Sequence, residues 1–203
     1  SKLWPGVLEA FRLIGSEQIQ GRASLGGNIC NGSPAGDSVP ALIAAGCIAL
    51  IAGPNGKREI PIEEFHIGPG KTVLDNGEML VSLKFPKREI NSSDAYLRMT
   101  PRTEMDIAVV GCGVNITFEN NVCTAARVSL GAVAPTPLLI KEASKIMVGS
   151  DLNSEILDKV SKICMDLCDP IDDKRGTIDY RTKVAGVLFK RATLTTIDRI
   201  KGN

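Results

Sequence analysis

The sequence lacks the features that mark several broad classes of protein. Its 24 basic and 23 acidic residues leave a formal net charge of +1, and neither sign gathers in a long block, so nucleic acid and membrane surfaces are poor partners. No apolar run reaches the ~18 to 20 residues that cross a bilayer, because Pro40 and Gly46 interrupt the longest candidate, at 39–52. No basic-then-apolar secretory leader opens the chain, and we therefore expect a cytoplasmic protein.

Metal ligands and catalytic groups are also scarce. The six cysteines include no C-x-x-C pair. Cys164 and Cys168 lie four apart on one face of an expected helix, where thiols usually pack as small core residues. The single histidine, His66, has no arrangement of carboxylates or cysteines that suggests a triad, and we expect a surface or packing role for it. The sequence thus predicts no metal site.

A polar, glycine-rich stretch at 23–37, with the sequence ASLGGNICNGSPAGD, is what the chain does contain. Gly26 and Gly27 carry no Cβ and are able to take positive φ. Successive N–H groups could then face an anion, and a diphosphate could approach the backbone closely. No Gly-Lys-Ser/Thr follows, as a Walker loop requires, and the third glycine of a G-x-G-x-x-G fingerprint is missing. The pattern alone leaves a plain turn open.

Short polar side chains flank the two glycines. Ser24, Asn28 and Asn31 add hydrogen-bond donors, whereas an ionised Asp37 can only accept. Asp37 therefore suits a ribose or ribityl hydroxyl better than a phosphate. It could equally cap the helix expected to begin near Pro40, and both roles are compatible.

The first part of the chain has a mixed pattern. We expect a helix at 1–11, a short helix at 40–46, a buried strand at 47–52 that turns at Asn55-Gly56 into a strand at 58–62, and a strand at 78–85. In the last strand Met79, Val81, Leu83 and Phe85 alternate with polar residues, which predicts that these four share a buried side.

The second part begins after a polar link at 87–94. Strands are expected at 96–99, 107–118 and 122–131. Thr136 could then cap a helix with Pro137 in its first turn, ending at Gly149. Two further helical stripes run over 156–167 and 178–200.

Further short motifs follow the glycine-rich stretch in order along the chain. They are Lys71-Thr72-Val73-Leu74, Gly77-Glu78-Met79-Leu80, Phe85-Pro86, Tyr96-Leu97-Arg98, Arg102 with Asp106-Ile107-Ala108, and Tyr180-Arg181 with Val187-Leu188 and Arg191. Together with 24–42, these motifs resemble, in order and spacing, the FAD-binding subunit of the molybdenum hydroxylases, the xanthine dehydrogenase and aerobic carbon monoxide dehydrogenase flavoprotein family.

The resemblance implies an α+β fold in two parts. Residues 1–90 would form the second subdomain of a two-part FAD-binding domain, an antiparallel sheet with helices. Residues 94–203 would form the C-terminal domain, a three-stranded antiparallel sheet packed on three helices. The first FAD subdomain of the family, with its own glycine-rich loop, has no counterpart here, so we expect the chain to begin in mid-domain and its partner subdomain to lie on a separate polypeptide or a longer chain.

The resemblance also implies the site. Ser24, Gly26, Gly27 and Asn28 would contact the FAD diphosphate and flavin region, and Asn31 stands where relatives have a short polar residue. Leu80 would lie near the flavin ring or adenine, unless it is a core residue. Arg98 would contact the cofactor or stabilise negative charge on reduced flavin. Ile14 stands where some relatives place an aromatic that stacks on adenine. Arg102, Asp106, Tyr180 and Arg181 would be structural, with a buried Asp–Arg pair holding sheet to helices.

The function implied is electron transfer. Substrate would be oxidised at a molybdopterin centre in one partner subunit, electrons would cross [2Fe-2S] clusters in another, and FAD here would pass them to NAD or another acceptor. Two alternatives stay open. One is a cofactor-free scaffold that docks the partner subunits, and the other is a different phosphate-ligand binder that uses the glycine loop without redox chemistry.

Overall fold

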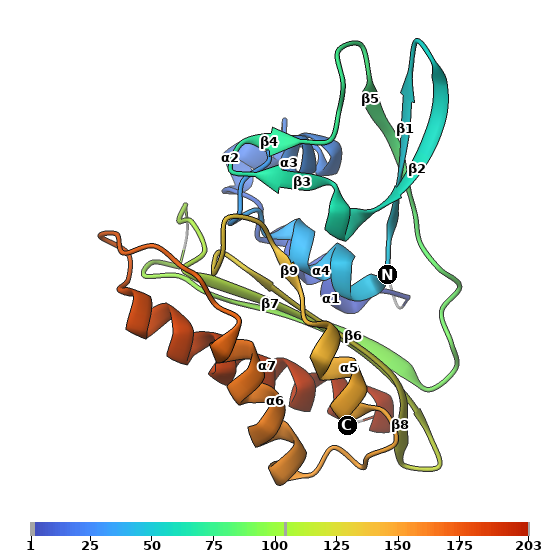
Figure 1. The fold of residues 1–203 in the computed structure, drawn as a ribbon, viewed down its shortest axis with the longest axis vertical. Helices are drawn as coiled ribbons and strands as arrows, with labels where there is room; N and C mark the ends of the chain where they lie inside the picture. The colour runs from blue at the N-terminus through green and yellow to red at the C-terminus, as the bar shows by residue number, and fades with distance from the viewer. Residues whose placement is uncertain (1–2, 104, 203) are drawn as a thin grey trace.

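A four-stranded antiparallel sheet lies at the centre of the computed structural model, which describes residues 3–103 and 105–202 (Figure 1). Its strands are β6 (Ser92–Met99), β7 (Val110–Glu119), β8 (Val122–Gly131) and β9 (Leu138–Leu139), in that order. Three of them are the strands expected from the sequence, and the short β9 adds a fourth. The α+β class is confirmed.

Helices cover both faces of this sheet (Figure 1). One face carries α5 (Lys141–Met147), α6 (Ser154–Asp166) and α7 (Ile178–Lys201), and the other carries α1 (Pro5–Arg12) and α4 (Ser38–Ala45). The expected helices at 156–167 and 178–200 correspond to α6 and α7. The helix expected at 1–11 corresponds to α1, although residues 1 and 2 lie outside the described part.

Glycines in the sheet let α4 lie directly on it. A Cβ built on Gly113 would stand 2.5 Å from the carbonyl oxygen of Pro40, and one on Gly131 would stand 2.6 Å from the Pro40 ring. Every residue of α4 is buried. Because any larger side chain at Gly113 would meet backbone, this face of β7 is shaped to receive α4.

A smaller sheet forms the other half of the first part, in the order β2-β1-β5. Its strands are β1 (Ile48–Gly53), β2 (Gly56–Pro61) and β5 (Met79–Lys84). The hairpin predicted at Asn55-Gly56 is confirmed, with Gly53 paired to Gly56 and Gly56 at φ 108°. The remaining elements are α2 (Glu17–Gln20), α3 (Leu25–Cys30), the 3-10 turn η1 (Ile62–Glu64) and the hairpin of β3 (His66–Gly68) with β4 (Lys71–Thr72).

The buried side predicted for the strand at 78–85 is wrong in its first half. Met79 and Val81 are 63% and 49% exposed, whereas Leu80 packs on the core together with Leu83 and Phe85. The pairing of β1 with β5 shifts register at Leu50/Ile51, which leaves Val81 as an extra residue. Such a bulge moves the side chains before it to the opposite face, which the alternation alone does not reveal.

The helix expected to start at Thr136 and Pro137 is also wrong in its first turn. Leu138 and Leu139 pair with β8, Ile140 N–H donates to the Val128 carbonyl at 2.8 Å, and α5 begins only at Lys141. The residue before a proline avoids the helical region, so the Pro-Thr-Pro segment favours the extended backbone that β9 continues.

Two strand boundaries differ from the expected ones. β7 begins at Val110 rather than at 107, and β6 begins at Ser92, inside the polar link expected at 87–94. Asp94, at its end, is 2% exposed because its carboxylate accepts the Val7 N–H at 3.0 Å and pairs with Arg88 at 2.8 Å. The polar composition of this segment concealed the start of the strand. Its charged residue Asp94 is buried because it accepts a hydrogen bond from the first turn of α1.

Long-range polar contacts join the first part of the chain to the central sheet and α7. Arg127 on β8 donates to the Ile43 carbonyl and to Glu63, both at 2.9 Å. Glu9 on α1 pairs with Arg199 on α7 and accepts the Tyr96 N–H at 3.1 Å. Within the described part of the chain, no helix is long and apolar enough to cross a membrane.

Candidate functional site

Helix α3 holds the glycine pair of the candidate site. Ser24 is its N-cap, and the Ser24 Oγ accepts the Gly27 N–H at 3.0 Å. Gly26 and Gly27 lie in the first turn of this right-handed helix, and neither has positive φ. The positive φ that these two glycines are able to take is therefore not adopted. The pattern S-x-x-G reads equally as a capped helical turn, since serine is a favoured N-cap.

Gly26 faces open space. A Cβ built there would meet nothing within 4 Å, whereas one on Gly27 would stand 3.1 Å from the Ser24 Oγ. The fold of this chain therefore gives no steric reason for glycine at 26. The missing side chain leaves the backbone of α3 open to something outside the chain.

Four neighbouring hollows share lining residues along this side of the molecule. The first, about 310 Å³, is lined by Gly26, Leu25, residues 80–83 and Phe85. The second, about 230 Å³, shares Leu25 with it and includes Ser24 and Ile14. The third, about 330 Å³, shares Ile14 with the second and includes Asn28, Asn31 and Asp37. The fourth, about 380 Å³, shares Ala35 and Ile107 with the third. The row suits a long ligand.

Asp37 is held from both sides by residues of β6. The Tyr96 hydroxyl donates to one carboxylate oxygen at 2.8 Å, and Arg98 donates to the other at 2.7 Å. Arg98 also donates to the Leu13 carbonyl at 3.0 Å. Burial raises the pKa of the Asp37 carboxyl, while the Arg98 charge and the two hydrogen bonds oppose the rise.

The structure tests one of the two roles considered for Asp37, the capping of α4. Its side chain makes no capping hydrogen bond to α4, so the capping role is wrong. Arg98 contacts Asp37 but does not line any of the four hollows. Direct contact between Arg98 and a cofactor stays a prediction.

The two asparagines differ in their surroundings. The Asn28 side-chain oxygen accepts the Ser38 hydroxyl at 2.6 Å, and its amide nitrogen has no partner among the described residues. Asn31 is exposed at the C-cap of α3. Both amides line the third hollow, and both are able to donate to a ligand there.

The β3–β4 hairpin supports the far end of α3. His66 is 7% exposed, and its Nε2 lies 2.7 Å from the Ile29 carbonyl oxygen, while Nδ1 is buried without a partner. Gly70 N–H donates to the Gly32 carbonyl at 2.9 Å. His66 therefore has the packing role, and burial lowers its pKa. A lone histidine gives no sequence signal for this backbone contact.

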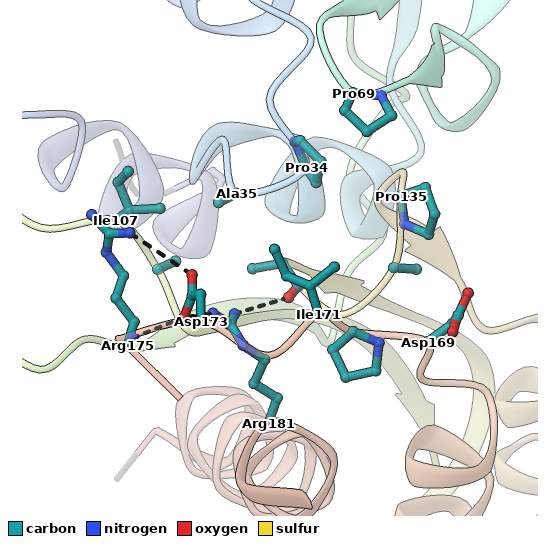
Figure 2. Close-up of a pocket in the computed structure, with 14 residues that line it drawn as sticks. Pro34, Ala35, Pro69, Ile107, Pro135, Asp169, Ile171, Asp173, Arg175 and Arg181 are labelled. Carbon is teal, nitrogen blue, oxygen red and sulfur yellow. Dashed lines mark hydrogen bonds and ion pairs between the residues drawn. The ribbon is translucent and has the colours of Figure 1, made fainter. Parts of the chain in front are cut away.

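The fourth hollow has an apolar wall and a charged floor (Figure 2). Figure 2 shows Arg175 and Arg181 on either side of Asp173, to which Arg181 donates at 2.7 Å. Arg181 also donates to the Val109 carbonyl at 2.7 Å, which ties α7 to β7. The buried Asp–Arg pair expected among these motif residues is therefore wrong, because the buried Arg181 pairs with Asp173, which is exposed. Asp106 pairs instead with Arg102 and Arg175.

Cys164 lies on α6, whereas Cys168 lies just beyond the end of this helix. Cys164 is buried, the Cys168 thiol donates to the Cys164 carbonyl at 3.1 Å, and burial raises their thiol pKa values to about 12 and about 11. Over residues 3–103 and 105–202, no cluster of three or more His, Cys, Asp or Glu side chains could hold a metal ion.

Comparison with known proteins places both parts of the chain. Residues 1–88 match the FAD binding domain in molybdopterin dehydrogenase, and residues 95–196 match the CO dehydrogenase flavoprotein C-terminal domain. The carbon monoxide dehydrogenase medium chain of Afipia carboxidovorans is 34% identical over 93% of this chain and 65% of the relative. The putative xanthine dehydrogenase FAD-binding subunit of Escherichia coli is 30% identical over 92% of this chain and 64% of the relative.

The solved structures agree with this match. A carbon monoxide dehydrogenase from Hydrogenophaga pseudoflava superimposes with a TM-score of 0.92 at 31% identity, over 96% of this chain and 68% of that one. The chain therefore spans about two thirds of the length of the relatives that it matches.

The residues present fit FAD, the cofactor of this domain. Gly26, which has no Cβ, lines the first hollow, and the amides of Asn28 and Asn31 line the third, where both are able to donate to a cofactor. The predicted site residues that line the first three hollows lie in the region matched by the FAD-binding model. The chain belongs to the flavoprotein family of the molybdenum hydroxylases, in which an FAD-binding domain is followed by the CO dehydrogenase flavoprotein C-terminal domain.

Proposed function

We propose that this chain is the electron-transferring flavoprotein part of a molybdenum hydroxylase complex. Electrons from substrate oxidised at a molybdopterin subunit cross [2Fe-2S] clusters in a second subunit and reach FAD at this chain. They leave for NAD or another acceptor. FAD supplies the redox chemistry, and the protein supplies binding, orientation and electrostatics.

The observation that carries the proposal is the open backbone at Gly26. None of the residues that the structure describes fills the space where its Cβ would stand, and the hollow that Gly26 lines is also lined by Leu80 from β5. A diphosphate approaching α3 would find the capped turn of Ser24, Gly26 and Gly27. Leu80 would contact the adenine or the flavin ring from the opposite wall.

The other residues act further along the row. The amides of Asn28 and Asn31 are placed to donate to the cofactor in the third hollow. Asp37 would accept a ribityl or ribose hydroxyl with the lone pairs that Tyr96 and Arg98 leave free. Arg98 would keep the Asp37 carboxylate ionised, and through it place charge near the cofactor.

The proposal includes the organisation of the complex. Residues 1–90 form the second FAD subdomain and 94–203 the C-terminal domain, in a cytoplasmic assembly. A first FAD subdomain, on a separate polypeptide or a longer chain, supplies the opposite wall of the cofactor cleft. The chain spans about two thirds of the length of the two relatives described above.

The test is a visible spectrum with and without that missing subdomain. The chain alone is expected to bind FAD poorly, because half of the cofactor would remain in water and each ~1.4 kcal/mol of lost contact is tenfold in the dissociation constant. Adding the missing subdomain should give a yellow stoichiometric complex, measured by flavin absorbance and equilibrium dialysis.

Two outcomes would count against the proposal. Absence of FAD even with the missing subdomain present would favour the scaffold that only docks partner subunits. Tight one-to-one binding by the isolated chain would show that the second subdomain suffices, and the divided cleft would be wrong.

A further inference from the structure

The contacts around Asp37 cross from one part of the chain to the other. Asp37 begins α4 in the FAD-binding part, whereas Tyr96 and Arg98 belong to β6 of the C-terminal part. The Tyr96 hydroxyl and the Arg98 guanidinium donate to different oxygens of the Asp37 carboxylate, at 2.8 and 2.7 Å. The carboxylate is thereby fixed in rotation as well as in position.

The surroundings of Tyr96 are built for this contact. Tyr96 is 2% exposed, and a Cβ on Gly111 of β7 would stand 2.6 Å from its hydroxyl oxygen. Glycine at 111 therefore leaves room for the phenol to reach Asp37. Arg98 is similarly enclosed, with 8% of its side chain exposed and a second bond to the Leu13 carbonyl.

Asp37 alone of the three lines the third hollow, where Asn28 and Asn31 also lie. We infer that Tyr96 and Arg98 are positioning residues for the cofactor site: they fix the Asp37 carboxylate so that it accepts a cofactor hydroxyl, and they make FAD binding depend on the C-terminal part of the chain. This inference rests on the proposed function.

The charge of the site depends on the same contacts. The charged and titratable groups that face the Asp37 carboxylate are Arg98 and Tyr96 from β6, and Asp106 lies across the third hollow. Without Arg98 a buried Asp37 loses its compensating charge, so it takes up a proton at a higher pH. A merely structural contact would have no such effect on cofactor affinity.

The experiment compares Tyr96→Phe, Arg98→Met and Arg98→Lys in the assembled flavoprotein. Tyr180→Phe and Arg191→Met are matched controls, because both side chains are exposed and lie on α7. Tyr96→Phe should raise the FAD dissociation constant roughly tenfold, as loss of a hydrogen bond to a charged group does. Arg98→Met should make the dissociation constant begin to rise with falling pH at a higher pH than in the wild type. Arg98→Lys should restore the wild-type profile.

A second readout works without FAD. The titration of Asp37, followed by carboxyl carbon NMR on the flavin-free chain, should move to higher pH in Arg98→Met and stay in place in both controls. If Tyr96→Phe and Arg98→Met lower only the melting temperature, with unchanged FAD affinity and pH profile, the positioning role is overturned. If the assembled wild type holds no FAD, the proposed function fails, and an unmoved Asp37 titration would overturn this inference separately.

Discussion

Enlarging the residue at position 26 should separate cofactor binding from folding. Gly26 lies in the first turn of α3 with nothing within 4 Å of its virtual Cβ. Gly→Ala in a helix stabilises by about 0.5–1 kcal/mol because glycine loses more chain entropy on folding. Gly26→Ala should therefore raise the melting temperature, by about 2–4 °C per kcal/mol for a chain of this size.

The same substitution should weaken FAD binding. The added carbon enters the hollow that Gly26 shares with Leu80, and crowding of a packed contact costs about 1–3 kcal/mol. That cost corresponds to about a 5- to 150-fold rise in dissociation constant. Gly26→Val, with two more methyl groups, should exceed Gly26→Ala in this respect.

The assay is titration of flavin-free assembled protein with FAD by fluorescence quenching, beside a thermal melt of each variant. Gly21→Ala and Gly21→Val are the matched controls. Gly21 is exposed, its backbone also has the right-handed helical conformation, and a Cβ built on it would stand 3.7 Å from its nearest neighbour, an ordinary contact. Gly26→Val protein that binds FAD as tightly as wild type would refute the assignment of α3 to the cofactor.

The remaining predictions concern burial and charge. Asp37→Ala should lower the free energy of unfolding by about 3–5 kcal/mol, because it leaves the buried Arg98 unpaired, and should weaken FAD binding by about 1–3 kcal/mol; urea unfolding and FAD titration measure the two, and unchanged stability would contradict the pair. Burial lowers the pKa of His66 below its unfolded value of 6.5, so the unfolded chain binds more protons below that pH and stability should fall as pH drops from about 6.5. Urea unfolding across this pH range should show that the stability of His66→Phe depends less on pH than that of the wild type. An equal pH dependence would mean that another group causes the effect. Gly113→Ala should destabilise by about 1–3 kcal/mol or more, since its Cβ would stand 2.5 Å from the Pro40 carbonyl oxygen; a melting temperature equal to wild type would show that α4 can move away.

Local signals predicted much of the fold. The Asn55-Gly56 turn, the short helix that ends near Gly46, and the stripes of α6 and α7 are all local patterns, and the structure confirms them. Such patterns work because each is decided by residues a few positions apart.

The failures came from long-range pairing. The face of β5 depends on a bulge opposite β1, and β9 exists only because β8 offers a free edge to Leu138 and Leu139. In the candidate site, the sequence singled out Asp37 and Arg98 without showing that they bind each other, 61 residues apart. Tyr96 was a motif residue whose hydroxyl partner no spacing could reveal.

The contacts of α1 also determine when it is able to fold. Asp94, which serves its first turn, lies 87 residues later, and Arg199, which pairs with Glu9, lies 190 residues later. On a ribosome that adds residues at about 5–20 per second, α1 therefore waits several seconds for its sheet and longer for its last partner. An isolated helix of 8 residues is marginal in water. The apolar residues Val7 and Ala10 of α1 pack in one core with α4, β1 and Tyr96 of β6, so the apolar side of α1 stays exposed until β6 has been made.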